Sequence, residues 1–285
     1  MTAEPDVGTF AGWDGTPLFR QRWPAETRRG VLVNVPGLGD HAGLYPNLVR
    51  HFPAHGWTVW ALDTRGNGRS PGRRGHIGAW REYRDDLAAF VRHVRAVEGD
   101  VPLVLLGNSL GGLMVLDYAL AHPAGLAGIA AAAPALGDPG VPKALLLLAR
   151  ALTRVWPTFT RETGLDLSNL SRDPAIVQAV ISDPHFHRAA TARLGTEALD
   201  TMAAVHASAG RLLVPTLVLH GTGDRMVPIE GSRRLAQGPG KDMVTLREYP
   251  EAGHALFVDL GYEERLADLL AWAEARVGHA PVGTV

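Results

Sequence analysis

The sequence contains no cysteine in 285 residues. This absence excludes disulfide bonds, a thiolate nucleophile and cysteine-based metal sites, and it leaves the redox compartment open. An excess of charge of either sign is also lacking, because 28 basic and 29 acidic side chains leave a formal net charge of −1. A chain without a strong positive field does not attract nucleic acid over long range, so we expect no nucleic-acid partner.

Long hydrophobic runs are missing as well. A membrane-spanning helix needs about 20 consecutive apolar residues, and the apolar runs here are shorter or interrupted by charge. The start, MTAEPDVGTF, has no basic cluster followed by an apolar stretch, so we expect no secretory signal. These absences predict a cytoplasmic protein whose contact with membranes, where it occurs, is peripheral.

What the sequence does contain is a series of short apolar runs separated by helical patterns. We predict strands, most of them buried on both faces, at residues 31–35, 57–62, 102–107, 126–134, 216–221 and 243–249. Around Asp14-Gly15, two alternating stretches predict an antiparallel hairpin. A helix is clearest over residues 80–97, where apolar residues recur every three or four positions. This alternation predicts an α/β fold with a mostly parallel sheet and ligand sites beyond the carboxyl ends of its strands.

One interval, from about Gly137 to Arg211, shows only helical or loop patterns. We interpret it as an inserted helical cap. The predicted organisation is therefore a core over residues 1–136, a cap over residues 137–211 and the rest of the core over residues 212–285.

A serine surrounded by glycines, in GNSLGG, follows the apolar run LVLL. The G-x-S-x-G pattern between a strand and a helix is typical of a sharp turn that strains the serine backbone and exposes its hydroxyl. Side chains at Gly107 and Gly111 would collide where strand and helix come close, and Gly112 lets the helix approach the sheet. We predict that Ser109 is a nucleophile. The alternative is a glycine-rich start of a helix without chemistry.

A serine hydroxyl needs a histidine to accept its proton and an acid to orient that histidine. In α/β folds with this turn the expected order is serine, acid, histidine. Asp224 follows a strand in LVLHGTGD, and His254 follows the next strand in YPEAGH. We predict Asp224 as the orienting acid and His254 as the base. The alternatives are a turn aspartate and an unremarkable loop histidine.

The negative charge that develops on an attacked carbonyl needs backbone donors. One is the amide of Leu110, at the amino end of the helix after the serine. The second is expected after the first central strand, in NVPGLGDHAGLY, where Gly37 allows close approach and the Leu38 amide is the donor. A plain turn is the alternative for this loop.

Other histidines carry weaker signals. His220 ends a strand and is expected to make structural hydrogen bonds, while His41 and His76 line the site or cap turns. His185 and His187 resemble a metal pair in spacing alone, and we interpret them as part of a polar loop. We expect no metal and no other cofactor.

Together these segments give the chain a family resemblance. PGLGDHAGLY, LDTRGNGRSPGRRGH, GNSLGG, HGTGDRMVPIEGS and YPEAGH occur in order and well spaced over most of the chain. The chain resembles the monoacylglycerol lipase and lysophospholipase branch of the α/β-hydrolases. The resemblance implies an α/β-hydrolase fold, a lid at about residues 137–211, and the same nucleophile, acid, base and oxyanion donors.

The chain departs from the family pattern at several positions. Pro36, Asn67 and Asn108 stand where the family usually writes histidine. In the family an acidic side chain and an arginine of the oxyanion loop are associated with the glycerol end of the substrate, and here these positions are Asp40 and Leu44. We expect Gly37, Asp40 and Asn108 to contact substrate. The missing arginine argues against a strict preference for monoacylglycerol.

Within the predicted cap, VPKALLLLARALTRVW places Lys143, Arg150 and Arg154 on one helical face, with apolar residues on the others. Such a helix lies at a lipid surface or covers the mouth of an acyl pocket. The alternative is a cap helix packed on the core with its basic residues in solvent.

The sequence therefore predicts a serine hydrolase that cleaves a small-molecule acyl ester, with a single-chain lipid such as a monoacylglycerol as substrate. A lysophospholipase or a short-chain carboxylesterase is the alternative among enzymes. A ligand-binding relative with little turnover is the alternative from another class.

Overall fold

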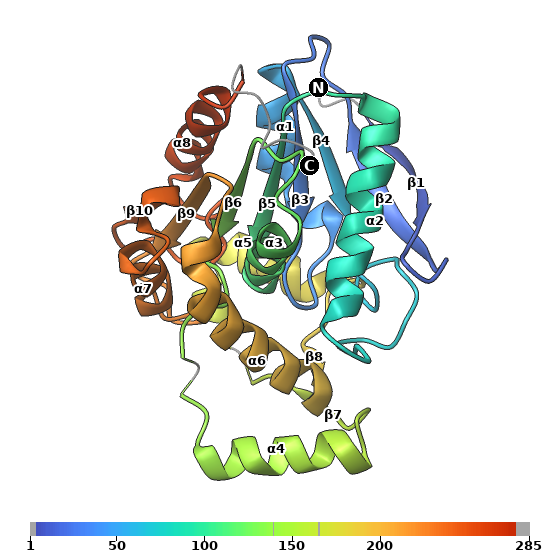
Figure 1. Cartoon of the computed structure of the whole chain (residues 1–285), viewed down its shortest axis with the longest axis vertical. Coiled ribbons are helices and arrows are strands. Elements are labelled where there is room, and N and C mark those ends of the chain that lie inside the picture. The colour runs from blue at the N-terminus through green and yellow to red at the C-terminus, as the bar shows by residue number, and fades with distance from the viewer. Residues whose placement is uncertain (1–3, 139, 165, 278–285) are drawn as a thin grey trace.

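The computed structural model of the chain describes residues 4–138, 140–164 and 166–277. Within these residues an eight-stranded sheet has the order β1-β2-β4-β3-β5-β6-β9-β10 (Figure 1). Its strands are β1 (Asp6–Ala11), β2 (Pro17–Trp23), β3 (Gly30–Val35), β4 (Trp57–Leu62), β5 (Leu103–Asn108), β6 (Gly128–Ala132), β9 (Thr216–Gly221) and β10 (Val244–Tyr249). β1 and β2 pair antiparallel, β2 joins β4 antiparallel, and the other strands run parallel.

The predicted strands and the hairpin at Asp14-Gly15 are confirmed. β3, β4 and β9 are buried at every position, because helices cover both faces of the parallel part of the sheet. β10 alternates between partly buried and exposed positions over most of its length because it forms the edge of the sheet. The fold class, a mostly parallel α/β sheet between two helical layers, is therefore confirmed.

Successive side chains of the strands enter two separate hydrophobic clusters. Leu103 and Leu105 of β5 enter the cluster under α2 (Arg81–Glu98) and α3 (Leu110–Ala121). Val104 and Leu106 enter the cluster under α1 (Pro46–Ala54) and α8 (Tyr262–Glu274). Each fully buried leucine or valine contributes about 1.5–3 kcal/mol, so both faces of the sheet stabilise the fold.

The segment between β6 and β9, called the insertion below, lies beyond the carboxyl ends of the parallel strands (Figure 1). It contains α4 (Lys143–Val155), β7 (Thr160–Glu162), α5 (Pro174–Ser182), β8 (Ala189–Thr191) and α6 (Ala192–Ser208). The expectation that this interval has no strand is wrong, because β7 and β8 form an antiparallel pair. Each of these strands has only three residues, too few for a periodic pattern to reveal them.

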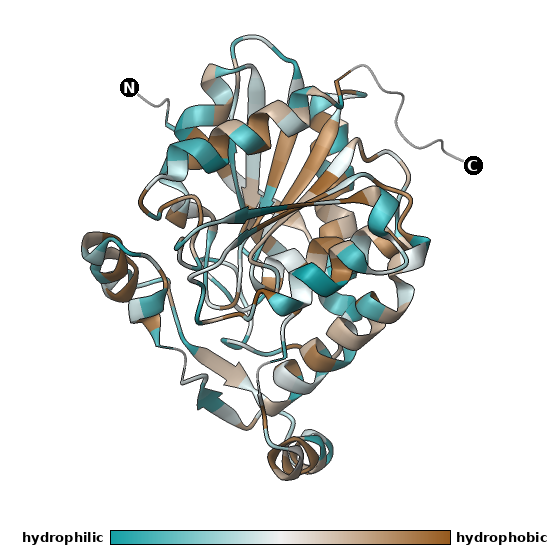
Figure 2. Cartoon of the chain, turned by 90° about the vertical axis from the view of Figure 1, so that its left-hand side faces the viewer, coloured by the Kyte–Doolittle hydropathy of each residue, from teal (hydrophilic) through white to brown (hydrophobic). Residues whose placement is uncertain are grey.

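α4 is the outermost element of the insertion. α6 packs against α3 of the core, and α4 packs against α6 (Figure 1). Viewed along its axis at the bottom of Figure 2, α4 carries both hydrophobic and hydrophilic residues. Leu147, Leu148 and Val155 are 69%, 56% and 81% exposed. Arg150, on the predicted basic face, forms an exposed ion pair with Asp200 of α6. The Lys143 side chain lies outside the described part.

No helix among the described residues combines the length and apolarity that a membrane crossing requires.

Candidate active site

Ser109 stands at the turn between β5 and α3, with backbone φ 55° and ψ −116°. A non-glycine residue with positive φ is strained, and the surrounding packing holds the serine in this state. The glycines are required by close approach. A Cβ at Gly107 would lie 2.1 Å from the Gly111 carbonyl oxygen, and a Cβ at Gly111 would lie 2.1 Å from the Val35 carbonyl oxygen. The backbone therefore has the geometry of an exposed-nucleophile turn.

His254 and Asp224 come from the loops after β10 and β9. The Nδ1 of His254 lies 2.7 Å from Oδ2 of Asp224. The other carboxylate oxygen of Asp224 accepts the backbone amides of Met226 and Val227 at 2.8 and 3.0 Å. Burial alone would raise the pKa of Asp224, but hydrogen bonds from His220 and His254 hold it well below its usual range. Asp224 is therefore an ionised, fixed acceptor for the His254 ring.

Two cavities meet near Ser109. The smaller one, about 100 Å³, is lined by both Ser109 and His254. Its other polar lining residues include Asp40, Asn108 and His187. The larger one, about 420 Å³, is lined mostly by apolar side chains of α4, α6 and the loop after β9. The two cavities share the lining residues Leu38, Thr163 and Met226.

The loop after β3 lies against the serine turn. A Cβ at Gly37 would lie 3.1 Å from the Asn108 carbonyl oxygen and 3.2 Å from the Cβ of Ser109, so a larger residue would require the serine turn to shift slightly. Leu38 lines both cavities, and Leu110 lines the larger one. The structure therefore brings the residues expected to supply oxyanion donors beside Ser109.

Asp40 and Asn108, both expected to contact substrate, line the smaller cavity but also bind protein groups. Asp40 accepts a hydrogen bond from the hydroxyl of Tyr45 and another from the amide of His41. Burial raises the pKa of Asp40 in spite of these bonds. The side-chain amide of Asn108 donates to Oδ1 of Asn34 at 3.1 Å. Both residues are thus fixed in place beside the cavity.

Asn67 was not predicted to belong to the site, although its replacement of a family histidine was a signal. Its Oδ1 accepts the amide of Gly39, in the loop after β3 that is predicted to be the oxyanion loop, at 3.1 Å. The same oxygen lies 2.9 Å from Nε2 of His187, in the insertion. Since Nδ1 of His187 accepts the amide of Ala189, Nε2 carries the hydrogen. Asn67 therefore joins the oxyanion loop to the insertion.

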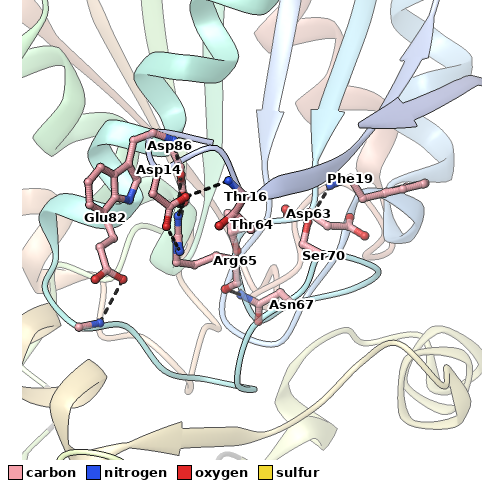
Figure 3. Close-up of polar contacts among 12 residues, drawn as sticks. Asp14, Thr16, Phe19, Asp63, Thr64, Arg65, Asn67, Ser70, Glu82 and Asp86 are labelled. Carbon is pink, nitrogen blue, oxygen red and sulfur yellow. Dashed lines mark hydrogen bonds and ion pairs between the residues drawn. The ribbon is translucent and has the colours of Figure 1, made fainter. Parts of the chain in front are cut away.

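The loop that carries Asn67 is anchored by Arg65 (Figure 3). The Nε of Arg65 donates to Asp86 of α2 at 2.7 Å, and its two terminal nitrogens reach Asp14 of the first hairpin at 3.2 Å. Asn67 in turn donates to Oγ1 of Thr64 at 2.7 Å. These bonds fix the loop between the hairpin and α2.

Asp259 and Arg172 were also missed. Asp259 is fully buried and accepts the amide of Gly253, the residue before His254, at 2.9 Å. It also accepts the amide and Nε of Arg172, in the insertion, at 2.7 and 2.9 Å. Next to this ion pair, the amide of Ala255 donates to the Leu170 carbonyl at 2.8 Å. The loop of His254 is therefore held by the insertion.

Two further histidines with predicted roles, His41 and His76, contact other parts of the protein. His41 caps the short helix after the oxyanion loop by accepting the amide of Gly43, and its Nε2 lies 3.2 Å from Asp183 of the insertion. Nδ1 of His76 lies 3.2 Å from the hydroxyl of Thr191. Across the described ranges, no group of three or more histidine, aspartate or glutamate side chains is arranged to hold a metal ion.

Comparison with known proteins places this geometry in a family. The family model described as serine aminopeptidase, S33, matches residues 26–261. The monoacylglycerol lipase of Mycolicibacterium smegmatis is 32% identical over 93% of this chain and 95% of its own length. The mouse monoglyceride lipase is 30% identical over 98% of this chain and 93% of its own. The crystal structure of Paleococcus ferrophilus monoacylglycerol lipase superimposes with a TM-score of 0.83 at 34% identity, covering 91% of this chain and 99% of that one. The chain therefore belongs to the serine aminopeptidase S33 family of α/β-hydrolases.

Proposed function

We propose that this carboxylic ester hydrolase cleaves esters of single-chain lipids, monoacylglycerols above all, through an acyl-enzyme formed on Ser109. The observation that carries the proposal is a single cavity lined by both Ser109 and His254, with the Nδ1 of that imidazole bonded to a buried carboxylate. A ring held through Nδ1 keeps Nε2 for proton transfer, which is the arrangement of a serine nucleophile and its base.

The proposed reaction has two halves. In the first, Ser109 Oγ attacks the ester carbonyl carbon while Nε2 of His254 takes its proton, and the alcohol then leaves with that proton. In the second, His254 takes a proton from water as the water oxygen attacks the acyl-enzyme, and Ser109 Oγ then leaves with that proton as the carboxylic acid is released. The amides of Leu38 and Leu110 stabilise the negative charge on the carbonyl oxygen in both halves. Asp224 keeps the imidazole in the required tautomer.

The two cavities support a division of the substrate. The larger, mostly apolar cavity suits an acyl chain, and its volume lies in the range of small-molecule sites. The smaller cavity, with Asp40, Asn108 and His187 in its wall, suits a polar alcohol such as glycerol. Leu44 in the same wall carries no charge, and Arg188, also in this wall, pairs with Glu162 at 3.0 Å. We propose that selectivity for glycerol rests on the fixed carboxyl group of Asp40.

We further propose that residues 137–211 act as a cap that collects substrate from micelles or membranes. Leu147, Leu148 and Val155 form an exposed apolar face on α4, while Leu145 and Leu146 of the same helix line the larger cavity. An amphipathic helix with an apolar face in solvent binds at lipid surfaces. A lipid that enters beside α4 would reach the larger, mostly apolar cavity along that helix.

The primary test is removal of the nucleophile. Ser109→Ala is expected to lower turnover of a p-nitrophenyl ester by about 10⁶, the loss seen when a serine nucleophile of this kind is removed. A fluorophosphonate should add its mass to the wild-type chain and not to the variant, with thermal unfolding as the control for folding. Near-normal turnover by the variant would refute the proposal.

A second test separates the alternatives. Monoacylglycerols, lysophospholipids and short-chain esters are compared on purified protein, with the acyl chain varied from short to long. Values of kcat/KM that rise with chain length on glycerol esters support the proposed substrate. A preference for lysophospholipids or for the shortest acids indicates the alternative enzymes. A single stoichiometric release of product without turnover indicates a ligand-binding relative.

A further inference from the structure

The carboxylate of Asp224 contacts two imidazoles. Its Oδ2 lies 2.7 Å from Nδ1 of His254 and 3.2 Å from Nε2 of His220. The side chains of His220 and Asp224 are both 0% exposed. His220 is the fifth residue of β9 and does not line either cavity described above. It is therefore placed to act on the acid and not on substrate.

The partners of His220 fix its tautomer. Nε2 lies 3.1 Å from the carbonyl oxygen of Val227 and 3.2 Å from Asp224, and neither of these oxygens can donate. Nε2 therefore carries a hydrogen. Nδ1 lies 2.8 Å from the hydroxyl of Ser232 in α7 (Glu230–Gln237), which can donate to a neutral ring. His220 completes its hydrogen bonds without taking up a second proton.

The other charges near His220 are already paired. Glu248 is its neighbour in β10, and both carboxylate oxygens of Glu248 are bonded by Arg233 of α7 at 2.9 and 2.7 Å. Among the described contacts of His220, Asp224 is the one partner that is both charged and fully buried. Any change at His220 must act first on Asp224.

We propose that His220 is a positioning residue that holds Asp224 in the orientation and charge state required by His254. The proposal rests on the proposed function, since it assigns His254 as the base. Backbone amides bond Oδ1 of Asp224 and His254 bonds Oδ2, while Nε2 of His220 lies 3.2 Å from the same Oδ2. Together these contacts oppose rotation of the carboxylate away from His254. A neutral donor is required for this task, because a second imidazolium on the same oxygen would compete with the charged His254 that forms during the reaction.

Two variants separate positioning from mere packing. His220→Gln keeps an N–H donor near the position of Nε2, and so near Asp224. His220→Asn is shorter, reaches the position of Nδ1 beside Ser232 and leaves Asp224 without this donor. We expect His220→Asn to lower kcat on a soluble ester by about tenfold, the loss typical when the outer partner of a fixed functional side chain is removed. KM should change little, and His220→Gln should recover most of kcat.

The pH profile provides a readout that packing alone would not move. Without the donor from His220, the negative charge of Asp224 is less compensated and stabilises a charged His254 more strongly. The acid limb of kcat against pH should therefore shift to higher pH in His220→Asn and stay near the wild-type position in His220→Gln. Asp224 itself does not titrate in this limb, because its hydrogen bonds hold its pKa well below the usual range.

Thermal unfolding of each variant checks folding, and Ser109→Ala tests the underlying mechanism separately. An inactive Ser109→Ala together with wild-type kcat and acid limb in both His220 variants would overturn this inference alone. Equal losses in the two variants with an unshifted acid limb would overturn it as well, because they indicate packing. If His220→Asn does not fold, Ser232→Ala replaces it. Loss of the hydroxyl at Nδ1 should shift the acid limb in the same direction, and an unshifted limb refutes the inference.

Discussion

The inner and outer parts of the insertion differ in how they are held. The inner part, residues 167–191, is hydrogen bonded to the loop of His254 and to the loop after β3: Arg172 binds Asp259 beside His254, and the amide of His187 donates to the Gly39 carbonyl at 3.1 Å. The outer part, α4, packs mainly against α6, which in turn packs against the core. Leu147 and Leu148 of α4 are exposed. One continuous segment thus contains a polar, fixed half and an apolar, exposed half.

This difference indicates that the insertion does not act as one lid. Lifting the inner part would break the bonds that place His254 and the loop after β3, so it forms one unit with the proposed catalytic centre. α4 has few such bonds and can change its position without disturbing them. Segments that open most easily are those with few buried contacts and exposed apolar surface. Movement for substrate entrance is therefore expected in α4.

The largest effect is expected where the inner part meets the His254 loop. Asp259→Asn replaces the carboxylate that accepts hydrogen bonds from Gly253 and Arg172 with an amide. The nitrogen of that amide donates and cannot accept. We expect kcat on a soluble ester to fall by about 10², because a displacement of about 1 Å at a catalytic group has this cost. The matched control is Asp200→Asn, which breaks the exposed pair with Arg150 in the outer part and should leave kcat unchanged. Equal kcat in the two variants would contradict the distinction.

A smaller effect is expected at Asn67. Asn67→Ala removes the acceptor shared by Gly39 and His187, so the Leu38 amide beside it loses its support. Removing an oxyanion donor costs about 10²–10³; here the donor is displaced and not removed, so we expect a loss of about tenfold in kcat. His187→Ala should add little in the Asn67→Ala background, since both act through the same oxygen. Fully additive losses would show that the two residues act separately.

Much of the fold and of the site could be predicted because the signals are local. β9 coincides with the predicted run at residues 216–221, since a strand buried on both faces has an apolar sequence. The Ser109 turn could be recognised from its flanking glycines. Glycine is required at Gly107 and Gly111 because a side chain at either position would collide with neighbouring backbone atoms. The order of strands then brought Asp224 and His254 to the same end of the sheet.

The contacts of the insertion could not be predicted in this way. Asp259 stands in HALFVDL without any pattern that sets it apart, and its partner Arg172 is 87 residues away. β7 and β8 each contain three residues, and their pairing depends on the chain between them. Such polar contacts depend on tertiary packing, which periodicity and spacing along the chain do not describe.

The faces of α4 provide a prediction within the outer part. Leu147→Asp combined with Leu148→Asp should weaken vesicle binding by about tenfold, because burial of each leucine is worth about 1.5–3 kcal/mol and insertion at a surface is incomplete. Activity on a soluble short ester should stay within twofold of wild type. Leu146→Asp is the matched control on the opposite face: it lines the acyl cavity and should impair long-chain esters in solution. Unchanged vesicle binding in the double variant would remove the proposed membrane role.

The smallest effect concerns stability against pH in the inner part. Burial would raise the pKa of Asp259, but hydrogen bonds from Gly253 and Arg172 outweigh it and lower the pKa below the usual range. A carboxyl group with a lowered folded-state pKa stabilises the fold above its unfolded pKa of about 3.9, and this contribution is lost as the pH falls through the folded-state pKa. The difference in free energy of unfolding between wild type and Asp259→Asn should thus be constant near neutral pH and shrink below about pH 4. Urea unfolding at a series of pH values measures it. A difference that grows with acidity would mean that the ion pair with Arg172 does not hold the inner part in place.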